Sequence, residues 1–195
     1  MTSSNKINFT DNGSSYSEQF QAFYFNIESG VQQSKQIFIK GNDIAKNLLT
    51  ANNDFCIAET GFGSGLNFLL TMKLYIELAQ QHPLAKLHFI SAEKYPLTKA
   101  QLKKSLNCFA ELSNEKRALV EQYPDKPTEK LQCTFFNQQI KLTIIFADAT
   151  QAYKGMILPK RSAGLVDAWY LDGFSPTKNP EMWQAELFDQ MAKLS

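Results

Sequence analysis

The chain has 195 residues, of which 44% are hydrophobic and 20% are charged. This length and composition predict one globular domain with an apolar core and exclude wholesale disorder. Twenty basic residues against nineteen acidic ones leave a net charge of +1, so the chain is no polycation and any contact with nucleic acid must be local. Seven basic and three acidic residues lie between positions 86 and 117, an excess that fits either a nucleic-acid-binding face or a solvated helix.

Cysteine and histidine are too few and too scattered for a usual metal site. The cysteines, Cys56, Cys108 and Cys133, form no Cys-x-x-Cys pair, and the histidines are His82 and His88. We therefore expect no bound metal, and the odd number of cysteines favours a reducing compartment.

The first residues carry no sign of export. Residues 1–22 are expected to form a polar extension before a domain at 23–195, and they lack the basic start and the apolar stretch of a signal peptide. The longest apolar run is broken by Lys73 and Glu77, so no membrane span is expected. These features predict a cytoplasmic protein and leave its oligomeric state open.

Four short apolar runs are predicted to be strands, and stretches with helical spacing follow them. The runs span residues 55–58, 87–92, 142–147 and 168–171. Continuous apolar runs without in-and-out alternation are typical of a parallel sheet covered on both faces. We therefore predict an α/β fold.

Helical periodicity and breaker residues divide the chain between these strands. Helices are expected at 66–78, at 97–109, around 119–123 and at 181–194, with a hairpin of 131–136 against 141–146 and a loop at 154–164.

An acidic residue stands at the end of every predicted strand: Glu59, Glu93, Asp148 and Asp172. In an open parallel sheet, ligands bind beyond the carboxyl ends of the strands. Four carboxylates are therefore expected along one edge of the sheet, where a ligand would lie.

A glycine-rich turn follows the first predicted strand. Gly61, Gly63 and Gly65 alternate in the segment ETGFGSGLN, which allows the backbone to approach a ligand where the next helix begins. The pattern is neither a P-loop nor a dinucleotide fingerprint. Glu59 would repel a pyrophosphate but would suit a ligand with an ammonium group, such as S-adenosylmethionine. Glu93 is then suited to the ribose hydroxyls and Asp148 to the adenine amino group.

The loop after the fourth strand, DGFSPTKNP, offers an acid beside stiff and apolar residues. Methyl transfer to a primary amine requires alignment and the loss of a proton, because such an amine has a pKa of about 10. Asp172 is the candidate group to hold the amine and accept the proton. Phe174 and Pro176 are expected to shape the substrate site beside Asp172, and Lys178 and Asn179 are expected to contact the substrate.

Three segments carry a resemblance to a known family. They are residues 57–69, which read IAETGFGSGLNFL, residues 91–97, which read SAEKYPL, and residues 166–183, which read VDAWYLDGFSPTKNPEMW. Together they resemble the methyltransferase domain of the bifunctional tRNA wobble-uridine enzymes of the MnmC family. The resemblance covers most of the chain.

The resemblance implies a class I, Rossmann-like methyltransferase that methylates 5-aminomethyl-2-thiouridine in tRNA with S-adenosylmethionine, giving 5-methylaminomethyl-2-thiouridine. By matching motifs, Glu59, Gly61, Gly63 and Gly65 would hold the methionine end, Glu93 the ribose, Asp148 the adenine side, and Asp172 the acceptor amine. The neighbouring Asn67, Lys94 and Ala149 are assigned to the same cofactor site. In that family an FAD-dependent oxidase domain usually follows; FAD is expected only if a longer polypeptide carries that domain.

Two features depart from the family pattern. The front segment reads QAFYF and QQSK where the family has acidic residues, so no substrate role is assigned to it. A class I sheet is expected to need further strands after residue 195, so the domain is expected to be incomplete.

Two alternatives stay open. One is a small-molecule amine methyltransferase, which the near-neutral charge would suit better. The other is a non-catalytic module that binds an adenosine ligand.

Overall fold

The computed structural model describes residues 7–10, 15–18, 20–23, 29–154, 156, 165–173 and 175–195. A five-stranded sheet has the order β6-β7-β5-β4-β8. Four of its strands run parallel: β4 (Phe55–Glu59), β5 (Leu87–Ala92), β7 (Ile140–Ile145) and β8 (Ala168–Tyr170). Strand β6 (Lys130–Phe135) pairs antiparallel with β7 and forms the predicted hairpin. The α/β prediction is confirmed.

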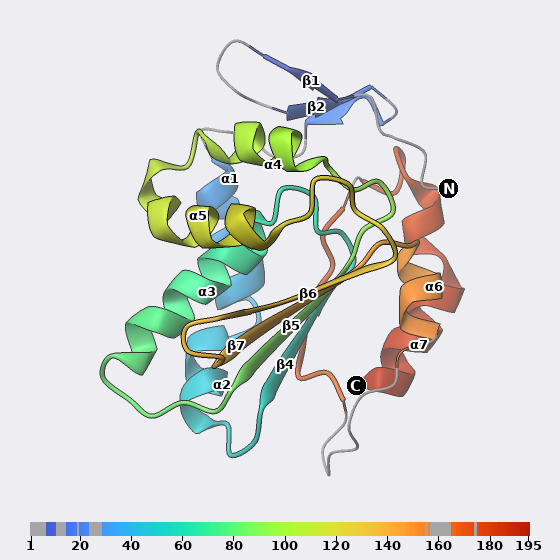
Figure 1. Ribbon diagram of the computed structural model, residues 1–195. Helices are drawn as coiled ribbons and strands as arrows, with labels where there is room; N and C mark the ends of the chain where they lie inside the picture. The colour runs from blue at the N-terminus through green and yellow to red at the C-terminus, as the bar shows by residue number, and fades with distance from the viewer. Residues whose placement is uncertain are drawn as a thin grey trace.

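Helices cover both faces of this sheet (Figure 1). One face carries α2 (Ile44–Thr50), α3 (Leu66–Ala79), α4 (Lys99–Leu106), the short 3-10 helix η2 (Ala110–Leu112) and α5 (Ser113–Gln122). The other face carries α6 (Ala149–Lys154) and α7 (Ala185–Leu194). Successive side chains of a strand point to opposite faces, so a strand buried on both sides needs apolar residues on both faces. In β4, Ile57 joins the α3-side cluster while Cys56 and Ala58 join the α6-side cluster.

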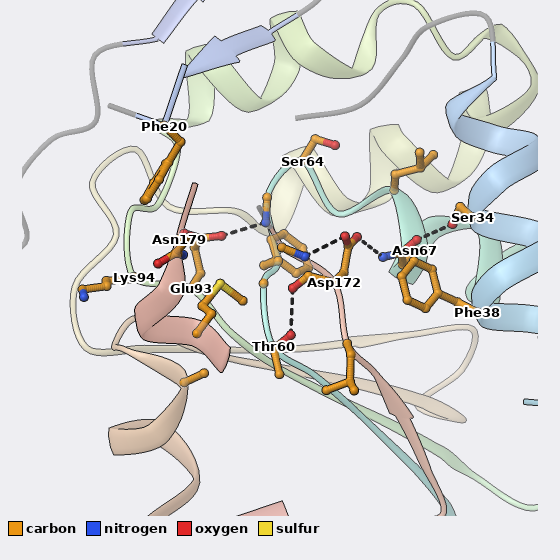
Figure 2. Close-up of a pocket in the computed structure, with 18 of the residues that line it drawn as sticks. Phe20, Ser34, Phe38, Thr60, Ser64, Asn67, Glu93, Lys94, Asp172 and Asn179 are labelled. Carbon is orange, nitrogen blue, oxygen red and sulfur yellow. Dashed lines mark hydrogen bonds between the residues drawn. The ribbon is translucent and has the colours of Figure 1, made fainter. Parts of the chain in front are cut away.

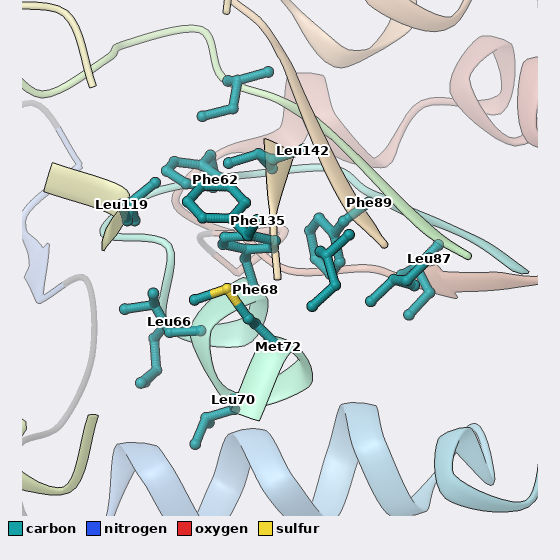
Figure 3. Packing of buried hydrophobic residues seen from close by; sticks show 14 of the residues in the cluster. Phe62, Leu66, Phe68, Leu70, Met72, Leu87, Phe89, Leu119, Phe135 and Leu142 are labelled. Carbon is teal, nitrogen blue, oxygen red and sulfur yellow. The ribbon is translucent and has the colours of Figure 1, made fainter. Parts of the chain in front are cut away.

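Aromatic side chains fill the core between α3 and the sheet (Figure 3). Phe68 of α3 is fully buried, with its ring 5.3 Å from that of Phe89 in β5 and 5.5 Å from that of Phe135 in β6. Phe89 in turn meets Tyr170 of β8 edge to face. Phe68 therefore ties α3 directly to β5 and β6, and Phe89 extends the contact to β8. These contacts fix the start of α3 relative to the carboxyl ends of the sheet.

The front of the chain adds elements that the periodicity did not predict. Strands β1 (Ile7–Phe9), β2 (Ser15–Ser17) and β3 (Ala22–Phe23) form a small antiparallel sheet, and α1 (Gly30–Ser34) continues into the π-helix η1 (Lys35–Lys40). The expected boundary between residues 22 and 23 falls inside β3.

The helix expected at 181–194 is divided in the structure, and most of the expected loop at 154–164 is not described. The helix expected at 181–194 is a 3-10 helix, η3 (Pro180–Trp183), followed by α7. Gln184 between them is extended, with φ −85° and ψ 151°, so the prediction of one continuous helix was wrong. The apolar stripe that packs α7, Leu187, Met191 and Leu194, starts only after this residue. Most of the loop expected at 154–164 lies outside the described residues.

Candidate active site

A cavity of about 380 Å³ lies at the carboxyl ends of the parallel strands, within the size range of small-molecule sites (Figure 2). Its walls bring together nine of the residues expected from the sequence. These are Gly61, Gly63, Asn67, Glu93, Lys94, Asp148, Ala149, Asp172 and Asn179.

The glycine turn lets the backbone lie close to the cavity and to its neighbours. A Cβ on Gly61 would stand 3.0 Å from the carbonyl oxygen of Asp172, so a side chain there would press on the β8 loop. Gly63 has a positive φ of 52°, and its N–H donates to the Glu93 carboxylate at 2.7 Å. Gly65, with φ 77°, precedes α3 and supports the turn without lining the cavity. Gly61 and Gly63 therefore line the cavity with Gly65 behind them, and contact of these glycines with a cofactor stays a prediction.

Glu93 presents a buried carboxylate that is held by the backbone. Its second oxygen accepts from the N–H of Tyr95 at 2.7 Å, so two main-chain donors fix its orientation. Burial raises the pKa of Glu93 above its ordinary value, and these two hydrogen bonds oppose that rise. Carboxylate oxygens have further lone pairs, so this group can still accept from two hydroxyls.

Lys94 lies between two carboxylates at the β5 and β7 side of the cavity. Its Nζ is 2.7 Å from Glu181 in η3 and 3.3 Å from Asp148. The hydrogen bond to Glu181 is the main cause that raises the pKa of Lys94 to about 12. The other oxygen of Asp148 accepts from the N–H of Thr150, which fixes the carboxylate at the start of α6. An incoming amino group would share Asp148 with Lys94.

Asn67 links two carboxylates at the centre of the site, and Figure 2 shows its contacts with Asp172 and Ser34. Its Nδ2 donates to Asp172 at 2.6 Å and to Glu59 at 2.9 Å. Its Oδ1 accepts from the hydroxyl of Ser34 in α1. Because both carboxylates need a donor, these partners fix which end of the amide faces them. Ser34 thus orients Asn67, and Asn67 orients Asp172.

Glu59 lies beneath this network and does not line the cavity. Its side chain accepts from Asn67 and, at 2.7 Å, from the hydroxyl of Ser91, and only 1% of the residue is exposed. Burial first, and the nearby charge of Asp172 second, raise the pKa of Glu59 well above its ordinary value. Contact between Glu59 and the methionine end of a cofactor stays a prediction; the geometry gives Glu59 a supporting place behind Asn67.

Asp172 lies at the end of β8 with both oxygens oriented. One accepts from Asn67 and the other from the N–H of Gly173 at 2.8 Å, while Thr60 Oγ1 donates to its main-chain carbonyl. Burial raises the pKa of Asp172 above its ordinary value. A carboxylate of this kind, positioned by its neighbours and short of solvation, is suited to take a proton.

The expected substrate residues are distributed unevenly. Asn179 lines the cavity, Phe174 lies outside the described residues, and Pro176 and Lys178 do not line it. Lys178 Nζ instead donates to the main-chain carbonyl of Gln21 at 2.7 Å. Substrate contact by Pro176 and Lys178 is therefore not visible in the cavity and stays a prediction.

Sequence reasoning missed a large part of the cavity wall. The missed residues include several from the front segment and from around Asp172: Phe20, Phe23, Ser34, Ile37, Phe38, Leu171, Met182 and Trp183. They share no local spacing that separates them from ordinary core residues. The described part of the chain holds no group of three His, Cys, Asp or Glu side chains placed for a metal ion, and none of its helices is long and apolar enough to cross a membrane.

Comparison with known proteins shows which proteins the chain is similar to. Residues 110–195 match a family model described as S-adenosyl-L-methionine-dependent methyltransferase. The chain is 40% identical over 192 residues, 97% of its length, to a "tRNA 5-methylaminomethyl-2-thiouridine biosynthesis bifunctional protein MnmC" of Aeromonas hydrophila, and spans 29% of that protein. It is also 40% identical over 191 residues, 92% of its length, to the same-named protein of Legionella pneumophila, of which it spans 28%.

A solved structure supports the fold. The crystal structure of MNMC2 from Aquifex aeolicus superimposes with a TM-score of 0.72 over 98% of this chain and 57% of that one, at 22% sequence identity. The chain spans less than a third of the length of the MnmC relatives it matches. Along nearly its whole length the chain is therefore similar in sequence to the MnmC proteins, it shares its α/β fold with the MNMC2 structure, and its residues 110–195 match the S-adenosyl-L-methionine-dependent methyltransferase model.

Proposed function

We propose that this chain transfers a methyl group from S-adenosylmethionine to the amine of 5-aminomethyl-2-thiouridine at the wobble position of tRNA, giving 5-methylaminomethyl-2-thiouridine. The names of its relatives support the substrate, and the family description supports the cofactor. The observation that carries the proposal is the row of oriented acids in one cavity, which ends with Asp172 beside β8. The protein would act in the cytoplasm.

The cavity fits the cofactor from one end to the other. Asp148 and Ala149 would meet the adenine, Glu93 the ribose hydroxyls, and the main chain at Gly61 and Gly63 the methionine end. The fit rests on the chemistry of these groups: carboxylates able to accept from hydroxyl and amino donors, and a turn whose backbone a Cβ would crowd. When bound, the cofactor supplies an electrophilic methyl group.

Asp172 would bind and deprotonate the amine that accepts the methyl group. An alkylammonium ion with a pKa of about 10 must lose a proton before its nitrogen lone pair can attack. Asp172 would hold this group and accept its proton, and the freed nitrogen lone pair would then form the new N–C bond as the S–C bond breaks and S-adenosylhomocysteine leaves. Its raised pKa makes it a better proton acceptor than an exposed aspartate.

The proposal predicts methylation that depends on the wobble nucleotide. The complete polypeptide is incubated with methyl-labelled S-adenosylmethionine and either of two otherwise identical tRNAs, one with 5-aminomethyl-2-thiouridine and one with uridine at the wobble position. We expect label only in the first tRNA, with the product nucleoside identified by mass spectrometry. Equal labelling of the two tRNAs, or of neither, would contradict the proposal.

A salt series separates the tRNA substrate from a small amine. Contacts with phosphates release counterions, so the KM for tRNA should rise steeply with salt concentration. The lysines and the arginine of 99–117 provide cations on α4 and α5 for such contacts. If a free alkylamine is methylated as well as the tRNA and the KM for tRNA does not respond to salt, the small-molecule alternative is the better account.

A further inference from the structure

Exposed apolar side chains gather around the cavity. Among the described residues, six large hydrophobic side chains are markedly exposed, and three of them, Phe23, Ile37 and Leu171, line this one cavity. They are 51%, 59% and 36% exposed, respectively. Apolar surface held open to water around a cavity marks a place where a ligand covers it.

These three residues come from separate elements that are tied to β8 or to the loop that follows it. Leu171 directly precedes Asp172. Ile37 adjoins Phe38 in η1, and the ring of Phe38 stacks on Tyr170 of β8 at 5.2 Å. Phe23 ends β3, and the neighbouring Gln21 carbonyl accepts from Lys178 in the loop that follows Asp172.

The opposite end of the cavity is polar. Asp148 follows β7, and the sheet order β7-β5-β4-β8 puts three strand spacings between β7 and β8, or roughly 14 Å at about 4.8 Å each. Lys94, Asp148 and Glu93 provide charges on that side. The adenosine part of the cofactor suits the charged end, which leaves the apolar end beside Asp172 for the molecule that brings the amine.

We propose that Phe23, Ile37 and Leu171 form an apolar rim that receives the pyrimidine ring of the acceptor nucleotide while its aminomethyl arm reaches Asp172. This inference rests on the proposed function and adds the residues that select a heterocyclic amine over an alkylamine. A flat ring covers exposed apolar side chains, and aromatic contact with a base does not depend on base identity. An alkylamine would engage Asp172 but leave the rim in water.

The test compares two anticodon stem-loop RNAs, one with 5-aminomethyl-2-thiouridine and one with an abasic nucleotide at the same position. Their Kd values are measured by calorimetry on the complete polypeptide saturated with S-adenosylhomocysteine, so the readout needs no turnover. Base–aromatic contacts are worth about 1–3 kcal/mol, so the wild type should bind the base-bearing RNA roughly 5- to 150-fold more tightly. In Phe23→Ala and Ile37→Ala this ratio should move towards one, while the Kd of the abasic RNA stays the same.

Phe188→Ala provides the matched control, because Phe188 is 40% exposed on α7 and does not line the cavity. It should keep the wild-type ratio. The rim is refuted if both rim variants keep the wild-type ratio, or if they weaken S-adenosylhomocysteine binding as much as RNA binding, which would assign the rim to the cofactor. Failure of the proposed function would appear separately, as absence of methyl transfer by the wild type.

Discussion

Asp172→Asn is expected to lower kcat for methyl transfer by about 10²- to 10⁴-fold, the usual contribution of a positioned general base. The amide keeps the shape of the carboxylate but cannot accept the proton from the amine. In the wild type, Asn67 and Gly173 each donate a hydrogen bond to one carboxylate oxygen of Asp172. The asparagine amide has only one oxygen, so its NH₂ group must face one of these two donors. Rates are measured with tRNA at saturation, and the Kd of S-adenosylhomocysteine by calorimetry should change far less than kcat.

This loss should not reflect unfolding. Asp172 is a desolvated carboxylate near Glu59, so removing its charge relieves both burial and repulsion. This relief offsets the hydrogen bond that the amide loses, and the urea midpoint should be nearly unchanged. In the wild type, activity should fall as the pH drops through the raised pKa of Asp172, and the variant should lack this acidic limb. The control Asp189→Asn changes an exposed carboxylate on α7. Substantial activity in Asp172→Asn would remove Asp172 from the chemistry.

Asn67→Asp is expected to produce the second large effect, on activity and on stability together. The substitution replaces the donor shared by Glu59 and Asp172 with a third carboxylate. Three carboxylates in contact cannot all ionise, and two buried acceptors lose their partner, a loss of about 2–5 kcal/mol in the free energy of unfolding. Asp172 also loses its orientation, so we expect kcat to fall at least about 100-fold, a loss typical of a mispositioned reactive group. Urea denaturation and the methyl-transfer assay measure the two effects.

The pH dependence separates charge repulsion from simple loss of packing. Crowding raises the folded-state pKa values of these carboxyls above their unfolded values. The destabilisation should therefore be largest above those raised pKa values and should diminish as the pH falls through them, because a proton restores a donor. Asn114→Asp, on the exposed side of α5, should show neither effect. An unchanged urea midpoint in Asn67→Asp at every pH would show that the hydrogen-bond network does not hold the site together.

The strands were predictable because short apolar runs in the sequence mark most of them. The apolar run at 87–92 coincides with β5, and the predicted hairpin matches β6 and β7 to within one residue. Both faces of β5 are covered, so a strand of this kind needs apolar residues at consecutive positions, whereas β6 at the edge of the sheet alternates between exposed and buried residues. The gathering of the strand-end acids was also predictable, because the carboxyl ends of parallel strands meet at one edge of the sheet.

The side chains that complete the site were not predictable in this way. Ser34 meets Asn67 across 33 positions, and Gln21 meets Lys178 across 157. Such contacts depend on how the front segment packs on the finished sheet, and they leave no periodic signal in the sequence. Glu59 illustrates the converse: a strand-end acid suggests a ligand contact, but its side chain is buried against Asn67 and Ser91.

A crystal structure with S-adenosylhomocysteine bound tests the central claim most directly. The account predicts adenine against Ala149 with its amino group at Asp148, the ribose hydroxyls on Glu93, and the sulfur turned towards Asp172 and the apolar rim. A molecule bound in the reverse direction, with its sulfur at Asp148, or one bound outside this cavity, would contradict the account.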